Sequence, residues 1–322
     1  MAESSATLHE VERAGGPGRA RRGIVVAVAA VALLVVLYYG GGALWVHTID
    51  DDTDFAAEST APEGGSRAIA LAADLVEREV DRHRWVANDP FFLPGSVLDN
   101  MPNYQQGTVT AVSRFALEMT DQLGRTRGSS QADPDLERAA GLLRYPGTVW
   151  LFDFSTSLAP TASSESQYRR AVQALRAYNE RLARGEAVFE PRSDNLMATL
   201  ERMAADLGSA SAALDQRIAE RPFLVDTQAD DLFYRTRGRL YGYHLLLREL
   251  GHDFAAVIRE RQLQAAWAQM LASFRDAATL DPLVVTNGAP DGQMLPNHLA
   301  AQGFYLLRAR TQLKEIGNIL LK

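Results

Sequence analysis

The chain has 322 residues, of which 33 are Lys or Arg and 40 are Asp or Glu, giving a formal net charge of −7. This acidic balance excludes the basic surface with which proteins bind nucleic acid. Cysteine is absent, which excludes disulfides, lipid attachment at cysteine and thiol catalysis. The length allows a sizeable core in one large domain or two small ones.

Residues 1–22 form a polar tail, and residues 23–46 form an apolar segment without a charge. As a helix, these 24 residues extend roughly 36 Å at ~1.5 Å per residue, which exceeds the ~30 Å of a hydrocarbon core. Tyr38, Tyr39 and Trp45 lie near the C-terminal end, where aromatic rings settle at the headgroup level. We therefore predict a single transmembrane helix over residues 23–46.

The charges on the two sides of this span differ in sign. Arginine precedes it at positions 13, 19, 21 and 22, and aspartate follows it at positions 50, 51, 52 and 54. Positive flanks stay in the cytoplasm, so we predict a cytoplasmic N-terminus and an extracytoplasmic domain. A cleaved signal peptide, with "GGA" at 41–43 as its cleavage site, is the alternative. The apolar run is longer than the usual ~7–15 residues of a signal peptide, which favours an uncleaved anchor.

Residues 47–66 predict an acidic flank followed by a short tether. The alternating aspartates suggest calcium, but the EF-hand loop also needs Gly at its sixth and Glu at its twelfth position. Counted from Asp50, those positions hold Phe55 and Ala61. We therefore predict a solvated flank, and we predict no metal and no cofactor anywhere in the chain. The small polar residues 56–66 read as flexible.

Residues 67–322 show apolar residues at three- and four-residue spacing almost throughout. Start and stop signals divide this region into helices over residues 66–87, 164–185, 193–222, 230–251, 252–282 and 297 onward. Short turns between such helices make them antiparallel neighbours. We predict an all-α chain, in which one transmembrane helix is followed by an extracytoplasmic multi-helix bundle of αα-hairpins.

The last predicted helix carries leucine every seven residues, at positions 299, 306, 313 and 320. Gly303 and Gly317 lie on the same stripe, where the missing side chain predicts the close approach of another helix. Packing inside the bundle is favoured over a coiled-coil partner, because Arg310 interrupts the second seam. One stretch departs from the helical pattern: residues 145–160 are apolar and β-leaning, and predict either a loop that buries its aromatic rings or an exposed surface for membrane or protein.

Two turns in the sequence resemble each other and suggest a duplication. Residues 88–107 and 280–303 each contain Asp-Pro, then an apolar loop with glycine, then Pro-Asn. Asn103 and Asn297 should each cap the helix that follows, since an Asn side chain accepts a hydrogen bond from a free amide of the first turn. Turn chemistry alone also accounts for the likeness.

If the first and last hairpins run parallel, both turns lie at one end of the bundle and form the best candidate ligand site. If they run antiparallel, each turn is only a structural corner. Polar groups that converge on helix N-termini favour a ligand. The candidate ligand-binding residues are Asp99, Asn100, Asn103, Tyr104, Asn287, Asp291, Asn297 and His298.

Catalytic motifs are absent from the sequence, which has no phosphate-binding loop, no HExxH zinc helix and no GxSxG elbow. We assign no catalytic residue. His244 lies on a largely apolar helix and is expected to be a core histidine rather than a ligand. His298 is expected to be an exposed first-turn residue, with an anion site as the alternative. Asp226, Asp230 and Asp231 suit a helix N-terminus, or alternatively supply paired carboxylates.

Four segments carry a resemblance to a known family: "ALWVHTIDDDTDF", "LDNMPNYQQG", "DDLFYRTRGRLYG" and "PNHLAAQGFYLLRART". Together they are similar to an uncharacterised family of Gram-negative bacterial proteins, the domain of unknown function number 2333. The likeness covers nearly the whole chain after Arg22. It implies a bacterial inner-membrane protein with a periplasmic domain, and it supplies no catalytic residues.

The leading hypothesis is a non-enzymatic cell-envelope protein, anchored in the inner membrane through residues 23–46, whose helical domain contacts another envelope protein. The alternative is an enzyme that acts on peptidoglycan or another glycan with paired carboxylates, which lie ~5–9.5 Å apart in glycoside hydrolases. A ligand sensor is disfavoured, because a cytoplasmic tail of about 22 residues is too short for an output domain. The sequence does not determine an oligomeric state.

Overall fold

The computed structural model describes residues 17–57, 61–123, 132–152, 159–220, 226–289 and 295–322. Helices joined by turns make up these residues, and none of them forms a strand of a sheet. The first helix is continuous: α1 (Pro17–Val36), a π-helical turn at Leu37–Gly41 and α2 (Gly42–Val46) follow without a break. Residues 21–46 form a helix that is long and apolar enough to cross a membrane. The bundle buries none of its most apolar stretch of 18 residues. The predicted all-α fold with one N-terminal apolar helix is confirmed.

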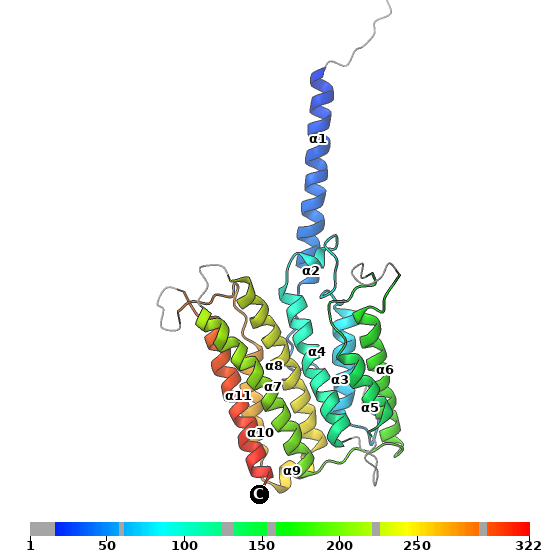
Figure 1. Ribbon diagram of the computed structural model, residues 1–322, viewed down its shortest axis with the longest axis vertical. Coiled ribbons are helices and arrows are strands. Elements are labelled where there is room, and N and C mark those ends of the chain that lie inside the picture. Colours follow the sequence, from blue (N-terminus) through cyan, green and yellow to red (C-terminus); the bar gives the residue numbers. More distant parts are fainter. Residues whose placement is uncertain (1–16, 58–60, 124–131, 153–158, 221–225, 290–294) are drawn as a thin grey trace, which may run out of the picture.

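The remaining helices form an elongated bundle below this helix (Figure 1). Their bounds are α3 (Arg67–Glu77), α4 (Asn100–Glu118), α5 (Pro134–Leu143), α6 (Ser164–Ala183), α7 (Ser193–Glu220), α8 (Thr227–Asp253), α9 (Ala255–Glu260), α10 (Gln264–Ala278) and α11 (His298–Leu320). We call the end from which the N-terminal helix projects the near end, and the opposite one the far end. The described parts of the turns at 83–99, 144–163 and 279–297 lie at the near end, as does the start of α8 (Figure 1).

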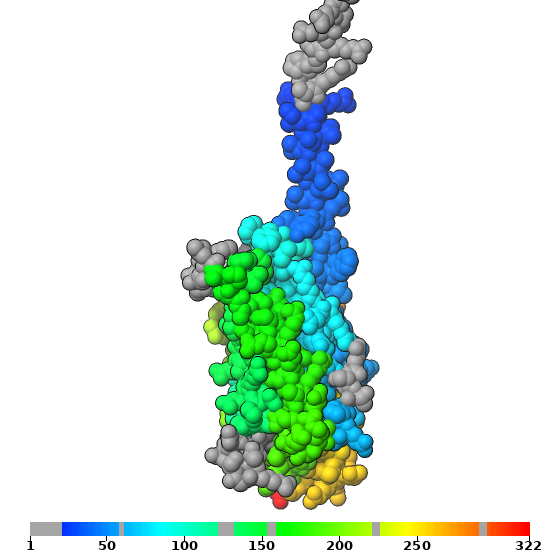
Figure 2. Space-filling model, turned by 90° about the vertical axis from the view of Figure 1, so that its right-hand side faces the viewer, coloured from blue at the N-terminus to red at the C-terminus, as the bar shows by residue number. Residues whose placement is uncertain are grey.

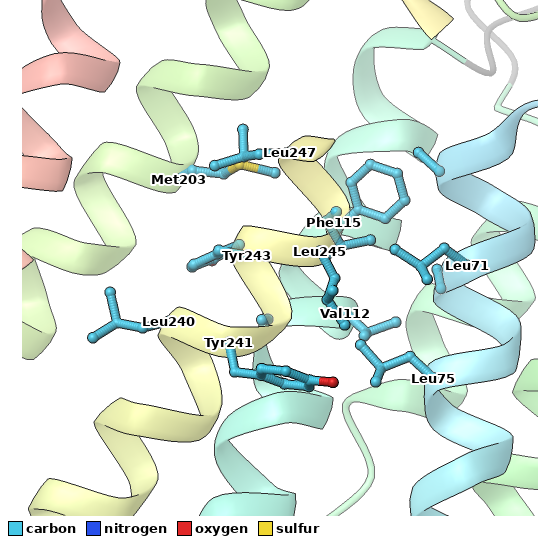
Figure 3. Close-up of a cluster of buried hydrophobic side chains, with 14 of the residues drawn as sticks. Leu71, Leu75, Val112, Phe115, Met203, Leu240, Tyr241, Tyr243, Leu245 and Leu247 are labelled. Carbon is cyan, nitrogen blue, oxygen red and sulfur yellow. The ribbon is translucent and has the colours of Figure 1, made fainter. Parts of the chain in front are cut away.

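Helix α8 is the centre of the bundle and contacts α3, α4, α7, α10 and α11. Its middle, from Leu240 to Leu247, is buried on every side, which is the pattern of a helix surrounded by others. Figure 3 shows side chains of α8 meeting Leu71 and Leu75 of α3 on one side and Met203 of α7 on the other.

The closest helix contact joins α4 to α8 through glycines. A Cβ added at Gly107 would overlap the carbonyl oxygen of Arg235, and one added at Gly238 would overlap that of Tyr104. The prediction of close approach at Gly303 and Gly317 is wrong, because an added Cβ would meet nothing within 4 Å at either position. The predicted leucine stripe of that helix is nevertheless buried, at Leu299, Leu306, Leu313 and Leu320.

Local end signals explain most helix boundaries. Helix α6 stops at the predicted Gly185, whose φ is +74°, and the amide of Glu186 donates to the carbonyl of Arg181. The single helix predicted over 252–282 is instead divided into α9 and α10. Gln262 adopts a φ of +55°, and the amide of Leu263 donates to the carbonyl of Ile258 at 2.9 Å, which ends α9 as glycine ends α6.

The two predicted Asn caps have different outcomes. Asn297 caps α11, and its side chain accepts from the amide of Ala300 at 2.7 Å. Asn103 is not a cap, because α4 begins at Asn100 and carries Pro102 inside its first turn. Proline is tolerated there since the first amides of a helix have no carbonyl partner within it. The Pro-Asn pairs therefore occupy different helix positions, which weakens the case for a duplication.

The stretch at 145–160 combines parts of both predicted interpretations. Tyr145 packs against the core, and its hydroxyl donates to the carbonyl of Ala162 at 2.9 Å. Trp150 contacts Phe92 and Phe152 outside the core, and Leu151 is exposed. Residues 153–158 lie outside the described residues.

Candidate functional site

The acidic segment after the N-terminal helix packs against the bundle, with Asp50 and Asp51 half-buried and Asp52 and Asp54 exposed. Ile49 and Phe55 pack against the core. Between them, the backbone is held by its own carboxylates, because Asp50 accepts from the amide of Asp52 and Asp52 accepts from the amide of Asp54, at 3.0 and 2.9 Å. We call residues 47–55, together with the three arginines described next, the junction.

Arg78 is the most buried charge of the junction, with 2% of its side chain exposed. It lies at the end of α3, where its guanidinium pairs with Glu79 at 2.8 Å, donates to the Tyr241 hydroxyl at 2.8 Å and covers the ring of Phe55 at 4.5 Å. It also donates to the carbonyl of Asp50 at 3.4 Å. Burial acts to lower the pKa of Arg78, but the charge of Glu79 and the bond to Tyr241 outweigh it, so the pKa is raised and the arginine stays charged.

Arg237 holds the segment from the opposite side. It projects from α8 with 3% of its side chain exposed, and it pairs with Asp51 at 2.6 Å and with Asp281 at 2.8 Å. Its Nε donates to the carbonyl of Ala278, the last residue of α10, at 3.1 Å. One guanidinium therefore joins the acidic segment to the turn that follows α10.

Arg248 and two tyrosines complete the contacts. Arg248 donates to the backbone carbonyls of Thr53 and Phe55. Tyr104 and Tyr241 are fully buried, and their hydroxyls donate to the carbonyls of Asp50 and Asp52 at 3.1 and 2.8 Å. Burial raises the pKa of both phenols, so they remain donors over the ordinary pH range. The prediction of a solvated flank is wrong in part: Asp50, Asp51 and Phe55 are half-buried against these cations and phenols, whereas Asp52 and Asp54 are exposed.

The sequence held a sign of this arrangement that our reading missed. Arg78 and Arg237 stand on helices whose neighbouring residues are buried, and an arginine is rarely buried unless it is paired. The acidic run at 50–54 is the complementary partner. Matching isolated buried arginines to an unassigned acidic run would have connected the two.

The N-terminal helix is also fixed from outside the junction. A Cβ added at Gly42 would lie 2.5 Å from the Cβ of Pro94, so the glycine allows the turn at 83–99 to rest on the helix. The hydroxyls of Tyr38 and Tyr39 donate to the carbonyls of Phe92 and Phe91 at 3.1 and 3.2 Å. Figure 2 shows this turn in cyan against the base of the blue N-terminal helix.

A cavity of about 930 Å³ opens between the N-terminal helix, the acidic segment and the end of α3. Its wall combines an apolar side with Trp45 and Val46 and a charged side with Asp50, Arg82 and Arg84. Arg84 is paired with Asp89 at 2.8 Å, and His83 lies 3.6 Å from both Asp50 and Glu79. Such a mixed wall suits an amphipathic ligand.

The first part of the predicted ligand site gathers at the start of α8. Asn103 donates to Asp231 at 2.5 Å and accepts from Arg235 at 2.8 Å, and Asn100 interacts with the Tyr234 hydroxyl. Burial and then the charges of Asp99 and Asp231 raise the pKa of Asp230 to about 6. Burial and Asp99 likewise raise the pKa of Asp231. Asp99, Asp230 and Asp231 therefore form a cluster of three carboxylates. Of these, only Asp99 was among the predicted ligand-binding residues.

The second part of the predicted site gathers around the start of α11. Asn297 donates to the Asn287 side chain at 3.1 Å, and Asn287 donates to the backbone carbonyl of Arg217 at 3.1 Å. His298 is half-buried rather than plainly exposed: its Nδ1 accepts from the amide of Thr286 at 3.0 Å, and burial lowers its pKa. Asp291 lies outside the described residues.

The two parts lie on either side of the first turns of α8, at the near end. Asn287 reaches Asp226, which caps α8, whereas Asn103 reaches Asp231 in its first turns. Tyr104 belongs to neither part, because it faces the junction. Within the described part of the chain, no group of three His, Asp or Glu side chains is arranged to hold a metal ion.

Comparison with known proteins gives one family. The profile of the family described as an uncharacterized protein conserved in bacteria, DUF2333, matches residues 21–229 and 225–322. The match covers almost the whole chain, so the chain belongs to this family, as its motifs predicted. No curated protein and no solved structure matches it.

Proposed function

We propose that this chain is a single-pass protein of the bacterial inner membrane and that its helical domain is a non-enzymatic scaffold of the cell envelope. In this proposal the N-terminus is cytoplasmic, residues 23–46 span the membrane, and the domain is periplasmic. The arginine-rich flank before the span and the acidic flank after it support this orientation.

The junction is the observation that carries the proposal. A domain on a flexible tether samples every orientation, whereas here the first residues after the span are bound inside the bundle by Arg78, Arg237 and Arg248. The buried side chains of the junction form ion pairs and hydrogen bonds that hold residues 47–55 in place. A domain held at a fixed angle to the membrane presents fixed surfaces to a partner, which suits a scaffold.

A reporter fusion tests the orientation. Alkaline phosphatase fused after residue 60 should be active, and a reporter that works only in the cytoplasm should be inactive at the same position. The opposite pair of results would reject the proposed topology.

A crosslinking experiment tests the scaffold role. The full chain is crosslinked in native membranes, and captured proteins are identified by mass spectrometry beside an Arg84→Met control at equal expression. A discrete envelope partner should be captured by the wild type and by the control, and its yield should fall in Arg78→Met, which loosens the junction. Equal capture by the wild type and both variants would show that partner binding does not depend on the junction, and would reject the proposal.

A second candidate is an enzyme that acts on peptidoglycan or another glycan. The grouping of Asp99, Asp230 and Asp231 supports it, because a carboxyl group with a pKa of about 6 is partly protonated near neutrality and suits a general acid. Release of soluble fragments from purified peptidoglycan by the wild type, abolished in Asp230→Asn, would favour the enzyme over the scaffold. Equal and negligible release by both variants would remove it.

A further inference from the structure

Aromatic side chains from three separate segments gather beside the outer end of the N-terminal helix. Tyr38 and Tyr39 belong to the helix, Phe91 and Phe92 to the turn at 83–99, and Trp150 to the turn at 144–163. The ring centroids of Phe91 and Phe92 are 5.5 Å apart, and those of Phe92 and Trp150 are 5.7 Å apart. We call these five residues the aromatic collar.

The hydrogen bonds of the collar define its level along the helix. The carbonyls of Phe91 and Phe92 accept from Tyr39 and Tyr38. Tyr38 lies eight residues before Val46, the last residue of the helix, which is roughly 12 Å along the axis at ~1.5 Å per residue. The turn at 83–99 therefore extends back along the helix toward the membrane, beyond the point where the helix ends.

This level falls within about one helical turn of the boundary of the hydrocarbon core. A core of ~30 Å accommodates about 20 helical residues, so a span that begins at Gly23 leaves the core near Gly42. Phe91 is nonetheless 83% exposed in the isolated chain. Aromatic rings at this depth are what proteins place at the membrane interface.

Other turns of the near end also expose apolar side chains. Its turns expose large hydrophobic side chains at Val97, Leu98, Leu151, Leu283, Val284 and Leu295, and Leu283 is fully exposed. Large exposed apolar side chains gathered at one end of a bundle mark a surface that meets a partner or a membrane. The N-terminal helix leaves the bundle from this same end, so whatever the helix spans lies directly opposite these turns (Figure 1).

We infer that the near end of the bundle is seated in the interface of the outer leaflet of the membrane that its own helix crosses. The partner is a phospholipid bilayer, which the collar enters beside the helix and which Leu283 and Val284 meet farther out. The domain then has two membrane contacts, the span and the near end, and stands end-on to the bilayer. This inference rests on the proposed span of residues 23–46, and the test below separates the two.

The absence of cysteine makes the test direct, because one introduced cysteine gives one label. The full chain is reconstituted in vesicles of phosphatidylethanolamine and phosphatidylglycerol, with an environment-sensitive fluorophore at a single position. The four variants are Val31→Cys within the span, Phe91→Cys and Val284→Cys at the near end, and Leu321→Cys. Leu321 is 72% exposed at the far end, close to the 70% of Val284, and is the matched control for an exposed apolar position.

Quenching by lipids that carry a nitroxide at the headgroup or deep in the acyl chain then reports depth. Labels at 91 and 284 should be blue-shifted and quenched mainly by the headgroup nitroxide, the label at 31 mainly by the acyl nitroxide, and the label at 321 by neither. Replacing Phe91 and Phe92 together with serine should reduce quenching at 284, and Leu321→Ser should leave it unchanged.

Each other result has a distinct meaning. If the label at 31 is quenched while 91 and 284 behave like 321, the span is supported and the seated near end is rejected. If the labels at 91 and 284 are blue-shifted without lipid quenching, a second copy covers the near end and the inference is again rejected. If the label at 31 is not quenched, the proposed span itself fails.

Discussion

Replacing Arg78 with methionine tests whether the junction fixes the domain to its anchor. Methionine keeps most of the side-chain volume but removes the ion pair with Glu79 and the bonds to Tyr241 and Asp50. Glu79 is fully buried, so its carboxylate would be left without its cation. Removing one partner of a buried ion pair costs ~3–5 kcal/mol, because the remaining charge stays desolvated.

The assay is thermal unfolding of the detergent-solubilised full chain, followed by circular dichroism. For a domain of this size ~1 kcal/mol shifts the midpoint by roughly 2–4 °C, so Arg78→Met should lower it by about 10 °C. Limited proteolysis with an enzyme that cuts after acidic residues should show cleavage within residues 50–54 at temperatures where the wild type resists. This second readout separates release of the segment from general loss of stability.

Arg84 provides the matched control. It is also paired with an aspartate, Asp89, but 47% of its side chain is exposed, so Arg84→Met should cost at most ~1 kcal/mol. Adding Glu79→Gln to Arg78→Met should recover part of the lost stability, because it removes the stranded charge. An Arg78→Met variant as stable and as protease-resistant as Arg84→Met would refute the reasoning.

Three further predictions use the same measurement. Gly238→Ala should lower stability by ~1–3 kcal/mol or more, because the added Cβ overlaps the carbonyl of Tyr104. Gly303→Ala should raise stability by up to ~1 kcal/mol, because alanine has the higher helix propensity and its Cβ meets no other atom. Equal effects of the two substitutions would contradict the contact between α4 and α8. Burial lowers the pKa of His244 to about 4, so the folded state disfavours its protonation, and stability is lost as pH falls from about 6.5 toward 4. Between pH 7 and pH 5 the wild type should therefore lose roughly 2 kcal/mol more than His244→Leu, and parallel pH profiles would exclude this origin. Asn297→Ala should cost ~0.5–2 kcal/mol as the loss of a cap, and an unchanged midpoint would show that the cap does not contribute.

The sequence by itself determined the features that depend on neighbouring residues. An uncharged stretch of 24 residues indicates a helix long and apolar enough to cross a membrane, without reference to the rest of the chain. Gly185, Ser193 and Asn297 mark helix ends because stop and cap interactions lie within a few residues of each other. Periodic spacing of apolar residues likewise predicted the all-α fold, since it reports which face of each helix is buried.

Only the tertiary structure decided which helices meet and where charges are buried. Gly107 and Gly238 look like Gly303 and Gly317 in the sequence, yet only the first two lie at a backbone contact, because that contact pairs residues more than a hundred positions apart. Asn103 and Asn297 share a local pattern but differ in role. Asn103 lies inside α4, where its side chain donates to Asp231 instead of capping the helix. The partners of Asp50 and Asp51 are Arg78 and Arg237, 28 and 186 positions along the chain. Ion pairs of this kind leave no periodic pattern, because their geometry is set by the packing of whole helices.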